Sequence, residues 1–153
     1  MNYNNIGKKL YETLESEEVT LKYVVDFLFK TFKNYDWIGI YIVKGDELVL
    51  GYWKGEKATE HNTIPIGVGV CGSAAKSGKT ENVSDVMKDE RFIACFLTTK
   101  SELVVPIKER GVVIGEIDID SDTKNAFSKN DEYILENLAM NPVFIDLVKK
   151  HAV

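Results

Sequence analysis

The sequence predicts an α+β protein with a central antiparallel sheet, terminal helices on one face of the sheet and loops on the other. Three observations support this fold class. A helical pattern lies near the N-terminus, two hairpin patterns follow it, and a second helical pattern closes the chain. With 153 residues, of which 44% are hydrophobic, we expect a single domain over residues 1–153 that has its own core.

The helical patterns lie at the two ends of the chain. The segment "LKYVVDFLFKTF" at 21–32 spaces its apolar residues three or four apart. The segment 6–14 before it is a weaker helix candidate. At the other end, residues 128–150 begin with Ser128 and Asp131 in capping-box spacing. Pro142 should kink this last helix or divide it in two.

The strand patterns form two hairpins with a short strand between them. The first hairpin pairs 37–43 with 48–53 across the turn "KGD", because both runs are rich in apolar, β-branched and aromatic residues. The stretch "HNTIPIG" at 61–67 predicts a short third strand. The second hairpin is "SELVVPIKERGVVIGEIDID" at 101–120, with its turn at "ERG".

Between the third strand and the second hairpin, "GVCGSAAKSG" predicts a short helix that ends at Gly78. The polar stretch 81–94 that follows predicts a long irregular excursion over the surface. Such excursions often carry function.

Charge and hydropathy exclude several classes of partner. The net charge is −5 and the pI about 5.1, and no basic block occurs, so a nucleic-acid partner is not expected. No apolar run approaches the ~20 residues that span a bilayer, and the polar N-terminus lacks a signal-peptide core. We therefore expect a soluble cytoplasmic protein without a membrane partner.

The chain has two cysteines, Cys71 and Cys95. In a reducing cytosol such cysteines are more often free, catalytic or redox-sensing than bridged. With His61 and His151 they match no zinc-binding spacing, so we expect no metal.

The local setting leaves two interpretations open for each cysteine. Cys95 is either a buried small residue or a reactive thiolate stabilised by the loop that follows it. Cys71 starts the predicted short helix, where the helix N-terminus would lower the thiol pKa. It could equally pack that helix against the sheet.

Acidic residues cluster in the second hairpin. Asp118 and Asp120 lie two apart on one strand and therefore share a face, while Ile117 and Ile119 point to the core. Glu102 begins the neighbouring strand. A hydrated strand edge is slightly favoured by spacing alone, and a site for a cation is the alternative. Such a cluster would raise the pKa of at least one carboxyl.

Two tryptophans, Trp37 and Trp53, lie in the first hairpin. Tryptophans in strands are usually part of the core, and this is the interpretation we favour for both. One of them could instead form the apolar wall of a pocket.

Several segments together resemble one family. "DWIGIYIV", "LVLGYWKG", "TIPIGVGVCGSAA", "FIACFLTTKSELVVPI" and "GEIDIDS" resemble, in this order, GAF domains, and more narrowly the free methionine-(R)-sulfoxide reductases. The resemblance covers most of the chain between residues 37 and 121. A generic GAF domain shares the strand pattern but not the combination of "IPIGVGVCG", "IAC…SELVVP" and "IDIDS".

The resemblance implies roles for individual residues. It makes Cys95 the catalytic cysteine and makes Glu102, Asp118 and Asp120 the carboxylates of the substrate site. Trp37 matches the tryptophan that lines the pocket for the methyl end of the substrate.

Two positions depart from the family pattern. His61 stands where many members carry a further, resolving cysteine, and Phe96 stands where an acid is common. The chain is in this respect similar to a two-cysteine subgroup, in which Cys71 is the sole internal candidate for the resolving thiol.

The implied reaction reduces free methionine-(R)-sulfoxide. Cys95 attacks the sulfoxide sulfur, and Glu102 or Asp120 protonates the oxygen. Cys95 is left as a sulfenic acid, which condenses with Cys71 to a disulfide. An external dithiol such as thioredoxin then reduces the disulfide, so no bound cofactor is needed. The family resemblance also suggests a homodimer.

Two alternatives remain at this stage. One is a GAF module that binds a small ligand without turnover. The other is a thiol redox sensor with a regulatory disulfide between Cys71 and Cys95.

Overall fold

The computed structural model describes residues 1–94 and 96–152, and its centre is a six-stranded sheet in the order β3-β2-β1-β6-β5-β4. All neighbouring strands run antiparallel. The strands are β1 Trp37–Lys44, β2 Glu47–Gly55, β3 Thr63–Pro65, β4 Glu81–Val83, β5 Ser101–Glu109 and β6 Val112–Ser121. The two predicted hairpins and the short third strand are confirmed.

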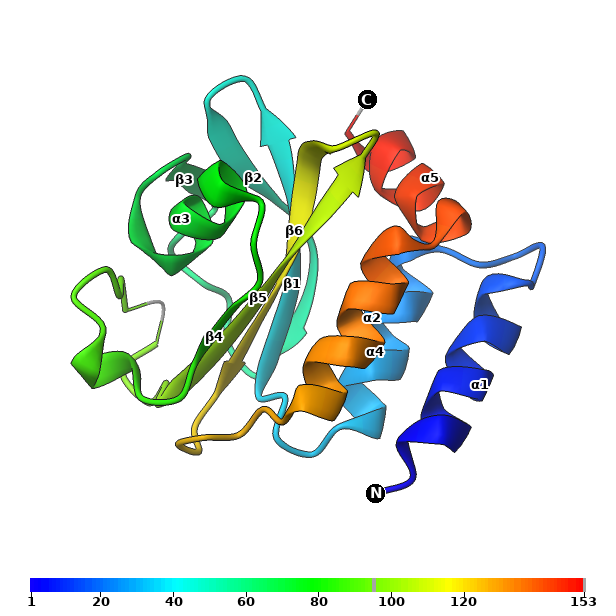
Figure 1. The fold of residues 1–153 in the computed structure, drawn as a ribbon, viewed down its shortest axis with the longest axis horizontal. Coiled ribbons are helices and arrows are strands. Elements are labelled where there is room, and N and C mark those ends of the chain that lie inside the picture. The colour runs from blue at the N-terminus through cyan, green and yellow to red at the C-terminus, as the bar shows by residue number, and fades with distance from the viewer. Residues whose placement is uncertain (95, 153) are drawn as a thin grey trace.

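Helices lie on both sides of this sheet. They are α1 Tyr3–Leu14, α2 Leu21–Thr31, α3 Gly69–Ser77, α4 Lys129–Met140 and α5 Pro142–His151, with a 3-10 turn η1 at Val86–Lys88. The helices α2, α4 and α5 lie along one face, with α1 beyond α2 and α4, whereas α3 lies on the opposite face (Figure 1). The predicted division into terminal helices on one face and loops on the other is confirmed, with α3 added to the loop face.

The hydrophobic core divides in the same way. Ile117 and Ile119 of β6 belong to the larger cluster between the sheet and the terminal helices, as their alternation with the acids predicts. Val70, Cys71 and Ala74 of α3 belong to a smaller cluster on the opposite face. The acidic side chains of β6 therefore point toward α3 and the loops.

Pro142 divides the C-terminal helix rather than kinking it. The helix α4 ends at Met140, and Pro142 is the first residue of α5, where its missing N–H costs no hydrogen bond. The side chain of Asn141 accepts hydrogen bonds from the backbone N–H groups of Val143 and Phe144. The predicted capping box of Ser128 and Asp131 is confirmed at the start of α4.

The stretch 81–94 is more regular than predicted. Its first three residues form β4, which pairs with β5, and η1 follows at 86–88. Three residues of the sequence "ENV" carry too little pattern to predict a strand, and β4 exists because the edge of β5 offers it backbone partners.

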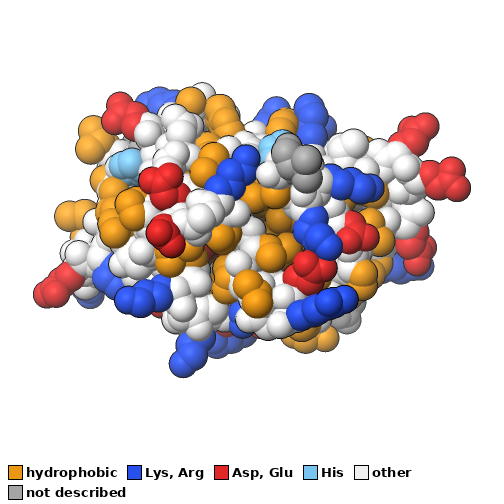
Figure 2. Space-filling view, turned by 90° about the horizontal axis from the view of Figure 1, so that it is seen from above, with side chains coloured by type: hydrophobic (Ala, Val, Ile, Leu, Met, Phe, Trp, Pro, Cys, Tyr) orange, Lys and Arg blue, Asp and Glu red, His pale blue; other side chains and the backbone are white. Residues whose placement is uncertain are grey.

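The surface agrees with the balanced composition. In Figure 2, basic and acidic side chains are interspersed, and basic side chains form no continuous patch on the face shown. Among the described helices, none has both the length and the apolar character needed to cross a membrane.

Candidate active site

The strand register brings three of the predicted site residues into one row. Trp37 of β1 lies opposite Asp120 of β6, and Asp120 lies opposite Glu102 of β5. Asp118 stands one position deeper on the same face of β6, flanked by Gly39 and Val104. These four residues, predicted from separate segments, are neighbours on the sheet.

The carboxylates of this row are buried. The exposed fractions are 0% for Asp118, 2% for Asp120 and 5% for Glu102. A hydrated strand edge, which spacing alone slightly favoured, is therefore wrong. Within residues 1–94 and 96–152, the oxygens of Asp118 and Asp120 have no hydrogen-bond partner, and no lysine or arginine there forms an ion pair with either acid. Buried acids without a cationic partner are costly and are typical of a ligand site.

Sequence reasoning missed a fourth buried acid, Glu116. It lies two residues before Asp118 on β6, is 0% exposed, and has no hydrogen-bond partner for either carboxyl oxygen. The same alternation that placed Asp118 and Asp120 on one face also places Glu116 there. The sequence "GEIDID" contains the signal for this, because it places an acid at every second position, three in all.

The acids differ in their tendency to ionise. Burial raises the pKa of Asp118 to about 6, and the nearby Cys71 and Glu102 oppose this rise. Burial, followed by the charge of Asp118, raises the pKa of Glu102 and of Asp120 well above the usual range. Of the three acids, Asp118 therefore ionises most readily, and burial favours the protonated form of Glu102 and Asp120.

Cys71, the third residue of α3, is 4% exposed and packs in the cluster between α3 and the sheet. Its thiol donates a hydrogen bond to Glu102 Oε1 at 3.5 Å. Burial and the surrounding carboxylates, Asp118 first among them, raise the pKa of the thiol well above its usual range. The interpretation that the helix N-terminus lowers this pKa is wrong, because desolvation and negative charge outweigh the helix dipole.

The proposed catalytic residue Cys95 lies outside the described residues. Its neighbour Phe96 packs on Trp37, with the ring centroids 5.9 Å apart. Phe96 thus contributes to the aromatic end of the described site.

Trp37 combines both interpretations left open by the sequence. It is 2% exposed and stacks on Trp53 with centroids 6.3 Å apart, so it belongs to the core. It also lines a cavity together with Phe96 and Asp120, so it forms a wall.

Two glycines make room for the Trp37 ring. A Cβ atom at Gly39 would lie 2.2 Å from Trp37 Cη2, and one at Gly55 would lie 2.5 Å from Trp37 Cδ1. The ring therefore lies across two strand positions that lack side chains. Sequence reasoning could not identify this role, because it depends on the direction of the Trp37 side chain.

Replacing Gly39 by alanine should displace the Trp37 ring and lower the free energy of unfolding by ~1–3 kcal/mol, the usual cost of overpacking a core. Urea denaturation monitored by tryptophan fluorescence measures this change. Gly7→Ala is the matched control: nothing lies within 4 Å of its Cβ position, and alanine in the helix should stabilise by up to ~1 kcal/mol. Equal stability of the two variants would contradict the packing of Trp37 on Gly39.

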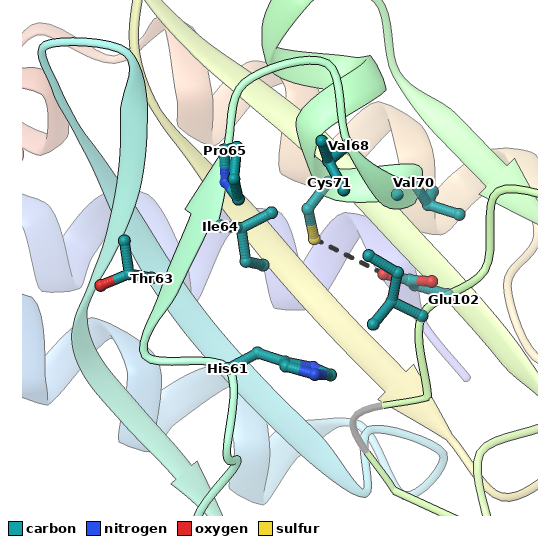
Figure 3. A pocket seen from close by; sticks show the side chains of 10 residues that line it. His61, Thr63, Ile64, Pro65, Val68, Val70, Cys71 and Glu102 are labelled. Atoms are coloured by element: carbon teal, nitrogen blue, oxygen red, sulfur yellow. Dashed lines mark hydrogen bonds between the residues drawn. The ribbon is translucent and has the colours of Figure 1, made fainter.

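The predicted site residues border two cavities rather than one. A cavity of about 150 Å³ is lined by Cys71 and Glu102, together with His61 and apolar residues of β3 and α3. Figure 3 shows the Cys71 sulfur directed at Glu102, with His61 across the cavity. Trp37 and Asp120 line the second cavity. Asp118 lines neither and lies beneath Glu102.

The buried acids predict an unusual pH dependence of stability. Burial, and then the charge of Asp118, raises the pKa of Glu116 well above its usual range. The folded state therefore keeps a proton that the unfolded chain releases as the pH rises above ~4.3, so stability falls with pH by up to ~1.4 kcal/mol per pH unit. Below that pH both states hold the proton and no difference remains.

Glu116→Gln removes this titration. The variant should match the wild type in thermal stability near pH 4 and become progressively more stable than the wild type toward pH 8. Thermal unfolding across this range measures the difference, with the exposed β2 residue Glu47→Gln as the control. A Glu116→Gln variant less stable than the wild type at pH 8 would contradict the assignment.

The site also contains donor atoms that could hold a metal ion. Each of three side chains offers one donor atom, and these atoms lie within 4.8 Å of one another; the residues are Cys71, Glu102 and Asp118. The expectation that no metal binds considered only cysteine and histidine spacing and did not count these carboxylates.

Comparisons with known proteins identify the family and the fold of the chain. The GAF domain family matches residues 8–141. The chain is 34% identical over 119 residues to the free methionine-R-sulfoxide reductase of Escherichia coli, which covers 78% of this chain and 71% of that protein.

Two solved structures are also similar. One is a type II free methionine-R-sulfoxide reductase from Thermoplasma acidophilum, with a TM-score of 0.81 and 38% identity over 93% of this chain and 96% of that chain. The other is the free methionine-R-sulfoxide reductase of Neisseria meningitidis in complex with its substrate. It has a TM-score of 0.85 and 32% identity over 99% of this chain and 92% of that chain.

Proposed function

Because the chain belongs to the GAF domain family and, within it, to the free methionine-R-sulfoxide reductases, we propose that it reduces free L-methionine-(R)-sulfoxide to L-methionine. The observation that carries this proposal is the buried acidic row on β5 and β6. Its members have no lysine or arginine partner among the described residues, and burial raises the pKa of each of them.

Asp118 is the group suited to hold the substrate ammonium. Its pKa of about 6 leaves it ionised at neutral pH, and both of its oxygens lack hydrogen-bond partners. An ammonium group would supply the missing counter-charge. In a peptide the corresponding nitrogen is an uncharged amide, so this contact favours the free amino acid. The apolar ring of Trp37 then bounds the methyl end.

Glu102 and Asp120 are suited to donate the proton that the reaction needs. Burial raises the pKa of both groups and so favours the protonated form that can donate. The Cys95 thiolate attacks the sulfoxide sulfur and forms a sulfur–sulfur bond, while the sulfoxide oxygen takes up the donated proton. The hydroxyl is then transferred to the Cys95 sulfur, and the sulfur–sulfur bond breaks with its electron pair going to the methionine sulfur. Methionine leaves, and Cys95 remains as a sulfenic acid. The sulfoxide is reduced by two electrons, and the thiol is oxidised by two.

Cys71 is the proposed resolving thiol, as in the two-cysteine subgroup. Its burial and raised pKa keep it protonated in the resting enzyme, which protects it from unwanted oxidation. Its hydrogen bond to Glu102 offers a route to activation. Once Glu102 has given its proton to the sulfoxide oxygen, it can accept the Cys71 proton. The Cys71 thiolate then displaces water from the sulfenic acid, and an external dithiol of the thioredoxin type reduces the disulfide.

The proposal is tested by turnover of separated R and S epimers of free L-methionine sulfoxide, with dithiothreitol as reductant. We expect methionine to form from the R epimer only. Tight binding of the sulfoxide without turnover by reduced, folded protein would instead support a ligand-binding GAF module. Formation of a Cys71–Cys95 disulfide by peroxide, without sulfoxide turnover, would support a redox sensor.

A further inference from the structure

The group formed by Cys71, Glu102 and Asp118 has the dimensions of a metal site. In a tetrahedral zinc site, Zn–S of ~2.3 Å and Zn–O of ~2.1 Å place the sulfur and oxygen ligands ~3.6 Å apart. The Cys71 Sγ to Glu102 Oε1 distance is 3.5 Å. A carboxylate oxygen of Asp118 lies within 4.8 Å of the Cys71 sulfur and of a Glu102 oxygen. A small side-chain adjustment would bring it to the distance of a third ligand.

We propose that Cys71, Glu102 and Asp118 bind a thiophilic divalent cation such as Zn²⁺, with Glu116 as a further oxygen donor. Glu116 lies on β6 two residues before Asp118, on the same face of the strand, and its carboxyl is buried. Three protein ligands and a fourth oxygen complete the four positions that Zn²⁺ prefers. On binding, the Cys71 thiol and any protonated carboxyl among the ligands release their protons to solvent, and the bonds to the metal replace the S–H and O–H bonds.

An independent observation points to a cation here. The oxygens of Asp118 and Glu116 are buried and find no hydrogen-bond partner among the described residues. Among the described residues, no lysine or arginine forms an ion pair with either acid. A divalent cation would satisfy these oxygens and offset their mutual repulsion.

The 150 Å³ cavity provides a path for the ion. Cys71 and Glu102 line it directly, and Figure 3 shows both side chains at its wall. A metal ion is small enough to pass this cavity and reach the sulfur without opening the sheet. The ligands come from α3, β5 and β6, which are regular elements and hold donor positions well.

The donor set selects the class of metal. One thiolate with carboxylates suits Zn²⁺, Co²⁺ or Cd²⁺, whereas Mg²⁺ prefers oxygen ligands only and keeps several waters. A consequence that rests on the proposed function is inhibition. The metal would occupy Asp118 and Glu102 and tie up the resolving thiol, so it would compete with the substrate ammonium.

The test uses the full-length, reduced Cys95→Ser protein, in which Cys71 is the one remaining thiol. Co²⁺ is titrated in, and the thiolate-to-cobalt charge-transfer absorption is followed. Zn²⁺ affinity is then measured by competition with a chromophoric chelator. Three double variants serve for comparison, each combining Cys95→Ser with a second substitution. The second substitution is Cys71→Ser, Glu116→Gln, or Asp85→Asn. The last of these changes a surface acid that pairs with Lys124.

We expect one Co²⁺ per chain with a charge-transfer band, displacement by Zn²⁺ and no displacement by Mg²⁺. The band should disappear with Cys71→Ser. Zn²⁺ affinity should fall by at least ~10–100-fold with Cys71→Ser and with Glu116→Gln, since this is the usual cost of losing a residue that supports a metal ligand. It should stay unchanged with Asp85→Asn. Absence of the band at stoichiometric Co²⁺, or equal Zn²⁺ affinity of the Cys71→Ser protein, would overturn the proposal. This readout needs no sulfoxide turnover, so it is independent of the proposed reaction.

Discussion

Replacement of Cys95 by serine should abolish turnover of free L-methionine-(R)-sulfoxide, with a loss of more than ~10³-fold in kcat. A hydroxyl does not ionise at neutral pH and cannot be oxidised by the sulfoxide, so the first step has no nucleophile. The measurement is methionine formation with dithiothreitol as reductant, made on protein shown to be folded by circular dichroism.

Cys71→Ser is the matched control. It should keep a part of the activity with dithiothreitol, because a small thiol can attack the Cys95 sulfenic acid directly. With thioredoxin as reductant it should lose activity, because the disulfide that thioredoxin reduces no longer forms. Full activity of Cys95→Ser, or complete loss in Cys71→Ser with dithiothreitol, would contradict the assignment of roles.

Asp118→Asn should lower kcat/KM for the free R epimer roughly 30-fold to several thousand-fold, mainly through KM. This fall corresponds to a loss of about 2–5 kcal/mol of binding free energy. The amide keeps the shape of the side chain but removes the buried charge that would pair with the substrate ammonium. The pH profile carries a second signature. The wild type should lose kcat/KM below an apparent pKa near 6, as Asp118 becomes protonated. This acid limb should be missing in the variant.

Asp146→Asn on α5, an exposed acid on the far face of the sheet, is the control for a general effect of charge. It should leave kcat/KM and the pH profile unchanged. An Asp118→Asn protein with wild-type KM would show that the ammonium is held elsewhere.

Most of the fold could be predicted from the sequence because its signals are local. Alternation identifies β1, β2, β5 and β6, and the capping box and Pro142 fix the ends of α4 and α5. The strand β4 could not be predicted, because its three residues become a strand only through pairing with β5. A non-local partner leaves no trace in the segment itself.

The grouping of three acidic residues could be predicted from the sequence, but their burial and their chemistry could not. Glu102, Asp118 and Asp120 meet as expected, yet spacing could not distinguish a hydrated edge from a buried cluster, since that depends on α3 and the loops above. The pKa of Cys71 was predicted in the wrong direction because a sequence shows the helix N-terminus but not the desolvation. Glu116 was detectable from the alternation of acids.

The most direct test of the account compares two substrates of the same reduced wild-type protein, free L-methionine-(R)-sulfoxide and its N-acetyl derivative. They share the sulfoxide and differ in the ammonium that Asp118 is proposed to hold. The account predicts that kcat/KM for the free amino acid exceeds that of the acetylated compound by at least ~30-fold. Equal kcat/KM for the two compounds, or no turnover of the free R epimer, would contradict it.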